Sequence, residues 1–133
     1  PSSRLIELHA AVCESQTAIM KLIKPGLTMK QLESAAEDIV GDSLLQLGLI
    51  KSKESKKIRQ FYPHAVSHFL GLDVHDTADY DLALSEGMVI TVEPGIYIQN
   101  ESLAVRIEDD VVITKDGCIN LSAQIPCDLL YYI

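Results

Sequence analysis

Hydrophobic residues recur with helical spacing through the first 48 residues of the chain. Between residues 4 and 24 they fall at offsets of three, four and seven, until Pro25 and Gly26 interrupt the pattern. A second stripe follows Thr28, which forms a capping-box signature with Gln31, and Gly48 is typical of the position just beyond a helix. The apolar positions are Leu5, Leu8, Val12, Ile19 and Leu22 in the first stripe, and Leu32, Ala35, Ala36, Ile39, Val40, Leu44 and Leu47 in the second. The pattern predicts a helical hairpin over residues 1–48 that covers other structure.

Beyond residue 60 the hydrophobic pattern changes to short runs rich in β-branched residues. The strongest runs are Val89–Val92 and residues 111–114, and weaker runs occupy residues 65–69 and Gly95–Ile98. Polar residues at 79–81 and 99–101 indicate turns. Helices followed by strands predict an α+β fold, in which the hairpin packs on a mainly antiparallel sheet and residues 60–133 form the β-rich part.

Composition limits the size of the protein and its partners. A chain of 133 residues that is 47% hydrophobic can bury one core, so a single domain is expected. The net charge of −8 argues against nucleic acid as a partner, and the absence of a long apolar run or signal argues against a membrane. Three cysteines without a CxxC spacing favour reduced thiols and an intracellular location, cytoplasmic or mitochondrial. Because the sequence opens on Pro1, we expect a piece of a longer protein.

Charge is unevenly distributed along the chain. Residues 64–110 hold ten of the nineteen acidic residues and a single base, Arg106. Such a segment attracts cations, and metal ions are the simplest candidates, although a solvated acidic surface is the alternative for its loop residues Asp76, Asp79, Asp81 and Glu86. The opposite imbalance, at residues 51–59, predicts an exposed basic loop.

Three of the four histidines lie close together, at positions 64, 68 and 75. His64 and His68 share a face in a strand and also in a helix, and Gly71 allows the backbone to bend before His75. The HExxH motif is absent because Ala65 follows His64. An isolated histidine is more often a satisfied structural residue, but this density of imidazoles indicates a site for a divalent metal ion and metal-assisted hydrolysis.

Two glutamates occupy positions where a free carboxylate would be costly. Glu93 ends an apolar strand, and an unpaired buried carboxylate there would cost several kcal/mol. Its partner is either a metal ion or Arg106, and Glu108 raises the same question. Arg106, Glu108 and Asp110 share one face of a predicted strand, so Arg106 could support Glu108 or bind substrate. We interpret Asp109 and Asp110 mainly as structural residues.

Three ordered motifs resemble the aminopeptidase P (Xaa-Pro aminopeptidase) family of pita-bread metallopeptidases. They are the run from His64 to Asp76, the run Glu93-Pro-Gly-Ile-Tyr97, and the run Arg106-Ile-Glu-Asp-Asp110. The sequences at residues 62–64 and 75–77 resemble those of the family branch that contains mitochondrial intermediate-cleaving enzymes. The resemblance covers nearly the whole chain, and it implies the C-terminal half of a pita-bread fold, with the hairpin on a curved sheet.

The resemblance also implies a two-metal site. In this branch the ions are usually manganese, although cobalt, zinc or iron would suit the same ligands. By position, His68, Glu93 and Glu108 would be metal ligands, Glu108 would bridge the ions, and Glu93 would also handle the proton of the attacking water. The family's two aspartate ligands come from strands before the hairpin, so we expect them upstream of this chain.

Four residues match substrate positions of the family. His64 and His75 would contact the substrate and stabilise the tetrahedral intermediate. Tyr97 and Arg106 match positions near the substrate pocket, with ordinary core packing as the alternative for Tyr97. The loop between Tyr97 and Arg106 is shorter than is usual in the family, which leaves the details of substrate binding open.

The activity implied by the resemblance is removal of the N-terminal residue before a proline in a peptide substrate. The chain alone would be inactive because its ligand set is incomplete. The alternative is a pita-bread protein that acts as a binding or creatinase-like module, which an upstream sequence without the two aspartates would favour. Because an isolated half leaves its sheet open, we also expect self-association into a homo-oligomer.

Overall fold

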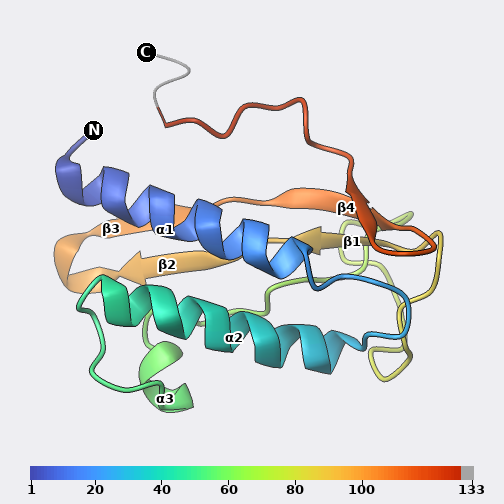
Figure 1. Ribbon diagram of the computed structural model, residues 1–133, viewed down its shortest axis with the longest axis horizontal. Helices are drawn as coiled ribbons and strands as arrows, with labels where there is room; N and C mark the ends of the chain where they lie inside the picture. Colours follow the sequence, from blue (N-terminus) through green and yellow to red (C-terminus); the bar gives the residue numbers. More distant parts are fainter. Residues whose placement is uncertain (130–133) are drawn as a thin grey trace.

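Two long helices lie side by side over the strands in the computed structural model, of which residues 1–129 are described (Figure 1). Helix α1 spans Ser3–Met20, and helix α2 spans Met29–Gln46. The capping box of Thr28 and Gln31 is present as predicted, because each side chain bonds the backbone of the other residue. Gly48 follows α2 with a φ of +70°, a conformation that favours glycine. The predicted helical hairpin is confirmed.

The strands form two antiparallel sheets. The first contains β1 (Val89–Val92), β4 (Asp109–Ile113) and β5 (Cys118–Asn120), in the order β1-β4-β5. The second pairs β2 (Gly95–Ile98) with β3 (Leu103–Arg106), and the short 3-10 helix η1 (Gln99–Glu101) closes this hairpin where a turn was predicted. Only two residues separate β1 from β2, and two separate β3 from β4. The sheets therefore meet at Glu93 and Glu108, which lie in these two links.

The structure corrects two of the predicted strands. Residues 65–69 do not form a regular strand, although Phe69 forms an isolated bridge with Ile90 and backbone hydrogen bonds join the segment to β1. The predicted strand through Arg106, Glu108 and Asp110 breaks between β3 and β4, because the chain passes there from one sheet to the other. The alternation of exposed and half-buried residues nevertheless persists through the break.

The core lies between the helices and the sheets. Its buried side chains come from the predicted helical stripes and from the β-branched strands, and they include Leu8, Val12, Ile19, Leu32, Val40, Leu44, Ile90, Val92, Ile96 and Val111. Their removal from water supplies the main stabilising free energy of the fold. The structure confirms the α+β class, and its helices lie over mainly antiparallel strands as predicted.

The basic stretch at residues 51–59 is more ordered than an exposed loop. It contains the helical turn α3 (Ser55–Ile58), in which the Ile58 side chain is buried, and Arg59 forms ion pairs with α2. The prediction of an exposed loop was therefore wrong for Ile58 and Arg59. Among residues 1–129, none of the helices combines the length and apolar character that a membrane crossing demands.

Candidate metal centre

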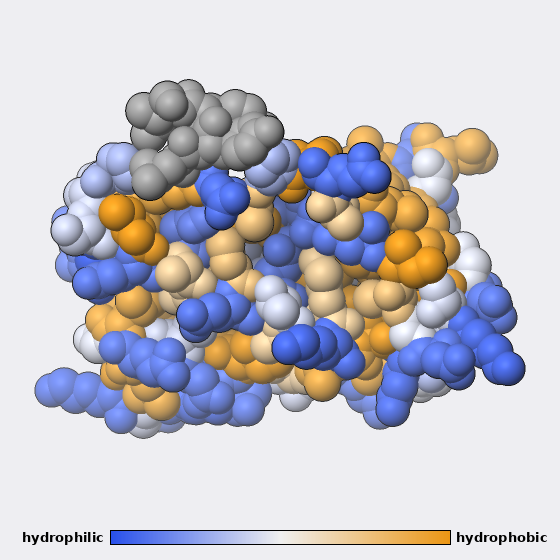
Figure 2. Space-filling view, turned by 45° about the horizontal axis from the view of Figure 1, so that its top comes forward, coloured by the Kyte–Doolittle hydropathy of each residue, from blue (hydrophilic) through white to orange (hydrophobic). Residues whose placement is uncertain are grey.

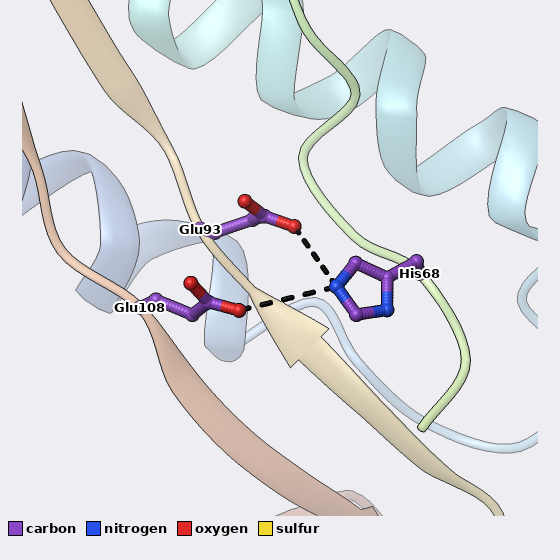
Figure 3. Close-up of side chains that lie close together, drawn as sticks. All are labelled: His68, Glu93 and Glu108. Carbon is purple, nitrogen blue, oxygen red and sulfur yellow. Dashed lines mark ion pairs between the residues drawn. The ribbon is translucent and has the colours of Figure 1, made fainter. Parts of the chain in front are cut away.

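His68, Glu93 and Glu108 converge from three separate segments of the chain (Figure 3). Nε2 of His68 lies 3.4 Å from Oε1 of Glu93 and 3.9 Å from Oε1 of Glu108. His68 and Glu93 are largely buried, with 11% of each side chain exposed, whereas 41% of the Glu108 side chain is exposed. The three residues proposed as ligands from the sequence are thus brought together within the described part of the chain.

The donor set fits a divalent cation. Two ligand atoms that each lie about 2.1 Å from an ion, at angles of about 90–109°, are roughly 3.0–3.4 Å apart. The His68–Glu93 separation is within this range, and the Glu108 side chain would need only a small adjustment. One imidazole and two carboxylates suit borderline to hard metal ions.

The tautomer of His68 strengthens this interpretation. Nδ1 of His68 lies 3.0 Å from the carbonyl oxygen of Phe69, and a carbonyl only accepts hydrogen bonds, so Nδ1 carries the proton. In a neutral ring, Nε2 then presents a lone pair to two carboxylate oxygens. This arrangement of three acceptors is favourable only with a cation between them, either a proton or a metal ion.

Glu93 has two kinds of partner in the structure. Its Oε1 faces His68 and accepts a hydrogen bond of 3.3 Å from the Thr91 hydroxyl, while its Oε2 lies 3.7 Å from Nη1 of Arg106. The two alternatives left open by the sequence, a metal ion and Arg106, therefore use different oxygens and are compatible. Arg106 is half exposed, so its side chain can also reach a bound ligand.

His75 packs against the candidate ligand His68, with ring centroids 4.2 Å apart. A tight loop turns the chain between them, and the carboxylate of Asp76 accepts hydrogen bonds from the backbone of Leu72 and Thr77. A Cβ at Gly71 would lie 1.8 Å from Oδ2 of Asp76, so a side chain at this position would displace the Asp76 carboxylate from the loop. The predicted bend at Gly71 is confirmed, and Asp76 has a structural role.

His64 forms a pair with Tyr97 beside Gly95. Nδ1 of His64 donates to the carbonyl of Ala65, at 2.8 Å, so Nε2 accepts the 2.9 Å hydrogen bond from the Tyr97 hydroxyl when the ring is neutral. A Cβ at Gly95 would lie 2.9 Å from the Tyr97 hydroxyl and 3.1 Å from Nε2 of His64. Tyr97 thus has a polar partner, so core packing alone does not account for its position.

Sequence reasoning missed two residues that support the centre. The buried Thr91 hydroxyl accepts a hydrogen bond from the His68 backbone and donates one to Glu93. Gln16 is a buried polar residue of α1, and its side-chain amide donates to the carbonyls of Val92 and Ile107, immediately before the two glutamates. A signal existed for Gln16, because it is a polar residue on the apolar stripe between Val12 and Ile19.

Comparisons with known proteins identify the family. A profile of metallopeptidase family M24 matches residues 1–115. Xaa-Pro aminopeptidase 3 of Rattus norvegicus is 48% identical over 134 residues, which cover 90% of this chain and 26% of that protein. The mitochondrial intermediate cleaving peptidase 55 of Arabidopsis thaliana is 35% identical over 92% of this chain and 27% of its own length. The chain belongs to metallopeptidase family M24.

A solved structure supports the same assignment. The structure of aminopeptidase P from E. coli with the inhibitor Pro-Leu superposes with a TM-score of 0.84, at 34% sequence identity, over 94% of this chain and 32% of that chain. The resemblance inferred from the three motifs is therefore confirmed at the level of family and fold. The chain spans about a third or less of the proteins that it matches.

Proposed function

We propose that this chain forms one wall of the active site of an Xaa-Pro aminopeptidase, which removes the N-terminal residue before a proline. The observation that carries the proposal is the convergence of His68 on both glutamates. The names of the relatives support the same substrate class, since they include Xaa-Pro aminopeptidases and a structure with the inhibitor Pro-Leu.

In this proposal His68, Glu93 and Glu108 hold two divalent ions, which we expect to be manganese, together with two aspartates from residues outside this chain. The ions, when bound, would polarise the scissile carbonyl and lower the pKa of the attacking water. Glu93 would handle the proton of the attacking water, and the Thr91 hydroxyl and Arg106 would keep its two oxygens in place. Glu108 is the more exposed of the two carboxylates and would bridge the ions.

The remaining residues would bind and orient the peptide. His64 bonds Tyr97 beside Gly95, two residues after Glu93, and His75 packs on His68. The ring N–H of His75 would donate to the substrate carbonyl as negative charge develops on it. His64, whose ring N–H is held by the Ala65 carbonyl, would keep the Tyr97 hydroxyl beside the peptide. Arg106 would attract the peptide through its exposed guanidinium group. The intracellular location and the absence of nucleic-acid partners stay predictions.

The proposal is tested in the full-length protein that carries this chain. His68→Ala removes the only nitrogen ligand of the cluster, so Mn²⁺ affinity measured by calorimetry should fall by more than the roughly 10–100-fold that loss of a supporting residue costs. Hydrolysis of a peptide with proline in the second position should be lost as well. His9→Ala is the matched control, because Nε2 of His9 lies 2.8 Å from the Cys127 carbonyl, outside the cluster.

Two results would count against the proposal. Unchanged Mn²⁺ affinity in the His68→Ala protein would contradict the metal centre. Metal binding by the unmodified protein without cleavage before proline would reject the aminopeptidase activity and favour the binding or creatinase-like module.

A further inference from the structure

An ion pair between Glu33 and Arg59 links α2 to the backbone of the segment from His64 to His68. Glu33, on the second turn of α2, accepts a hydrogen bond of 2.7 Å from Nη2 of Arg59 and one of 2.6 Å from the backbone N–H of Val66. Nη1 of Arg59 donates in turn to the carbonyl oxygen of His64, at 3.1 Å. The Glu33–Arg59 pair therefore bonds both His64 and Val66 through their main chain.

These contacts matter because no regular strand fixes this segment. Residues 60–88 form no named helix or strand within the described part of the chain. The Val66 peptide is held from two sides, since Glu33 accepts from its N–H and its carbonyl accepts a 2.8 Å hydrogen bond from the backbone of Glu93. A continuous path of hydrogen bonds thus runs from α2 through Val66 to the candidate ligand Glu93.

The surroundings keep the pair rigid. The Glu33 and Arg59 side chains are only 25% and 32% exposed, and the guanidinium carbon of Arg59 lies 5.0 Å from the centre of the fully buried Tyr62 ring. Burial and the nearby charge of Glu33 raise the pKa of the Tyr62 hydroxyl, so this group stays neutral and can donate to Glu33. The planar guanidinium group of Arg59 bonds Glu33 through Nη2 and the His64 carbonyl through Nη1, and partly buried contacts of this kind hold their geometry better than exposed ion pairs.

Glu37 provides an internal comparison one turn further along α2. Its carboxylate accepts a hydrogen bond of 2.9 Å from Nε of Arg59, and its pKa is lowered by hydrogen bonding to Ser55 and by Arg59. Glu37 therefore contacts the same arginine as Glu33. Its recorded hydrogen bonds and ion pairs, however, do not reach the segment between His64 and Val66.

We propose that Glu33 and Arg59 are positioning residues that set the place of His64 and His68 relative to Glu93. The inference rests on the proposed aminopeptidase function for its catalytic consequence, but not for its structural part. Glu33 accepts from the Val66 N–H while Arg59, bonded to Glu33, donates to the His64 carbonyl, so the two side chains act as one unit on this segment.

The test compares Glu33→Gln with Glu37→Gln in the full-length protein. Each substitution keeps the size of the side chain and removes one charge beside Arg59. Hydrogen exchange measured by mass spectrometry should become about tenfold faster in peptides that cover residues 62–68 of the Glu33→Gln protein, because the Val66 N–H loses a charged acceptor. The Glu37→Gln protein should exchange like the unmodified protein in these peptides.

Catalysis should separate the two variants in the same way. Misplaced catalytic groups cost up to about a hundredfold, so Glu33→Gln should lower kcat by roughly ten- to a hundredfold with a smaller change in KM. Arg59→Lys serves as a second variant if Glu33→Gln does not fold. A lysine cannot reproduce the two-pronged contact, so it should change exchange and kcat in the same direction.

Equal effects of Glu33→Gln and Glu37→Gln on exchange and on kcat would overturn the proposal, and so would unchanged exchange at residues 62–68. Failure of the proposed function has a different signature. The unmodified protein would then not cleave before proline, while the difference in hydrogen exchange between the variants would still test the positioning role.

Discussion

Thr91 occupies the point where His68 and Glu93 meet. Its hydroxyl accepts from the His68 backbone N–H at 3.1 Å and donates to Oε1 of Glu93 at 3.3 Å, and the residue is 1% exposed. The Thr91 backbone N–H also donates to the His68 carbonyl, at 3.0 Å. A single threonine therefore fixes the backbone of one candidate ligand and the carboxylate of another.

We predict that Thr91→Val destabilises the protein and weakens metal binding. Valine fills the same volume but leaves the His68 N–H without its acceptor, which should cost about 1–3 kcal/mol in the free energy of unfolding. Urea unfolding measures this cost, and calorimetry with Mn²⁺ measures the change in affinity. Thr17→Val, at an exposed position of α1, is the control and should leave both quantities nearly unchanged. Equal stability of the two variants would contradict the role of Thr91.

At the scale of residues, the sequence predicted the groups with distinctive chemistry and missed those that support them. The histidine cluster and the two glutamates beside apolar runs indicated a metal site from their chemistry, and the family resemblance then selected His68, Glu93 and Glu108 as its ligands. Glu33 and Thr91 carry no such signal, because their importance depends on contacts with Val66 and His68 across the fold. Such contacts follow from the packing of helix on sheet, which a local pattern does not specify.

At the scale of elements, α1 is tied to both sheets at the point where they meet. The Gln16 amide donates at 3.0 Å to the carbonyl of Val92, in β1, and at 3.2 Å to that of Ile107, between β3 and β4. These residues directly precede Glu93 and Glu108. The helix therefore sets the spacing of the two links that hold the carboxylates.

We predict that Gln16→Leu loosens this junction. The change keeps an apolar helix face but removes a buried donor to two carbonyls, so the free energy of unfolding should fall by about 1–3 kcal/mol. Hydrogen exchange should increase in peptides that cover residues 89–98 and 103–113. Glu14→Gln, at an exposed position of the same helix, is the control. A Gln16→Leu protein with unchanged exchange in both regions would show that α1 does not hold the junction.

The elements themselves were predictable where local physics decides them. The capping box and the apolar stripes specify α1 and α2, and β-branched runs specify β1 and the core of β4. The sequence could not predict that residues 65–69 remain irregular, since Glu33 and β1 satisfy their backbone groups instead of a regular ladder. It also could not place the break between β3 and β4, which depends on how the two sheets meet.

At the scale of the whole molecule, several large hydrophobic side chains are exposed. They include Leu72, Val74, Leu82, Ile119, Leu121 and Ile125. Figure 2 shows hydrophobic surface gathered toward the right-hand end of one face, beyond the end of α1. Strand β5 is the last in its sheet, so one of its edges has no neighbouring strand in the described part of the chain. Of these residues, Ile119 lies in β5 and Leu121 directly follows it, and exposed apolar groups beside an open strand edge favour association with another chain.

We therefore predict that the isolated chain of residues 1–133 associates with a second copy through the β5 edge. Ile119 and Leu121 are each 57% exposed there, so their burial would add apolar contact to the backbone pairing. Sedimentation velocity between about 1 and about 100 μM should show a sedimentation coefficient that rises with concentration, as a micromolar dissociation constant requires.

Ile119→Lys should shift the association to higher concentration, because a buried lysine charge at the edge opposes pairing. Leu45→Lys, at an exposed position of α2, should leave the association unchanged. A single monomeric species across this range would contradict the prediction, and equal effects of the two lysine substitutions would place the contact elsewhere on the molecule.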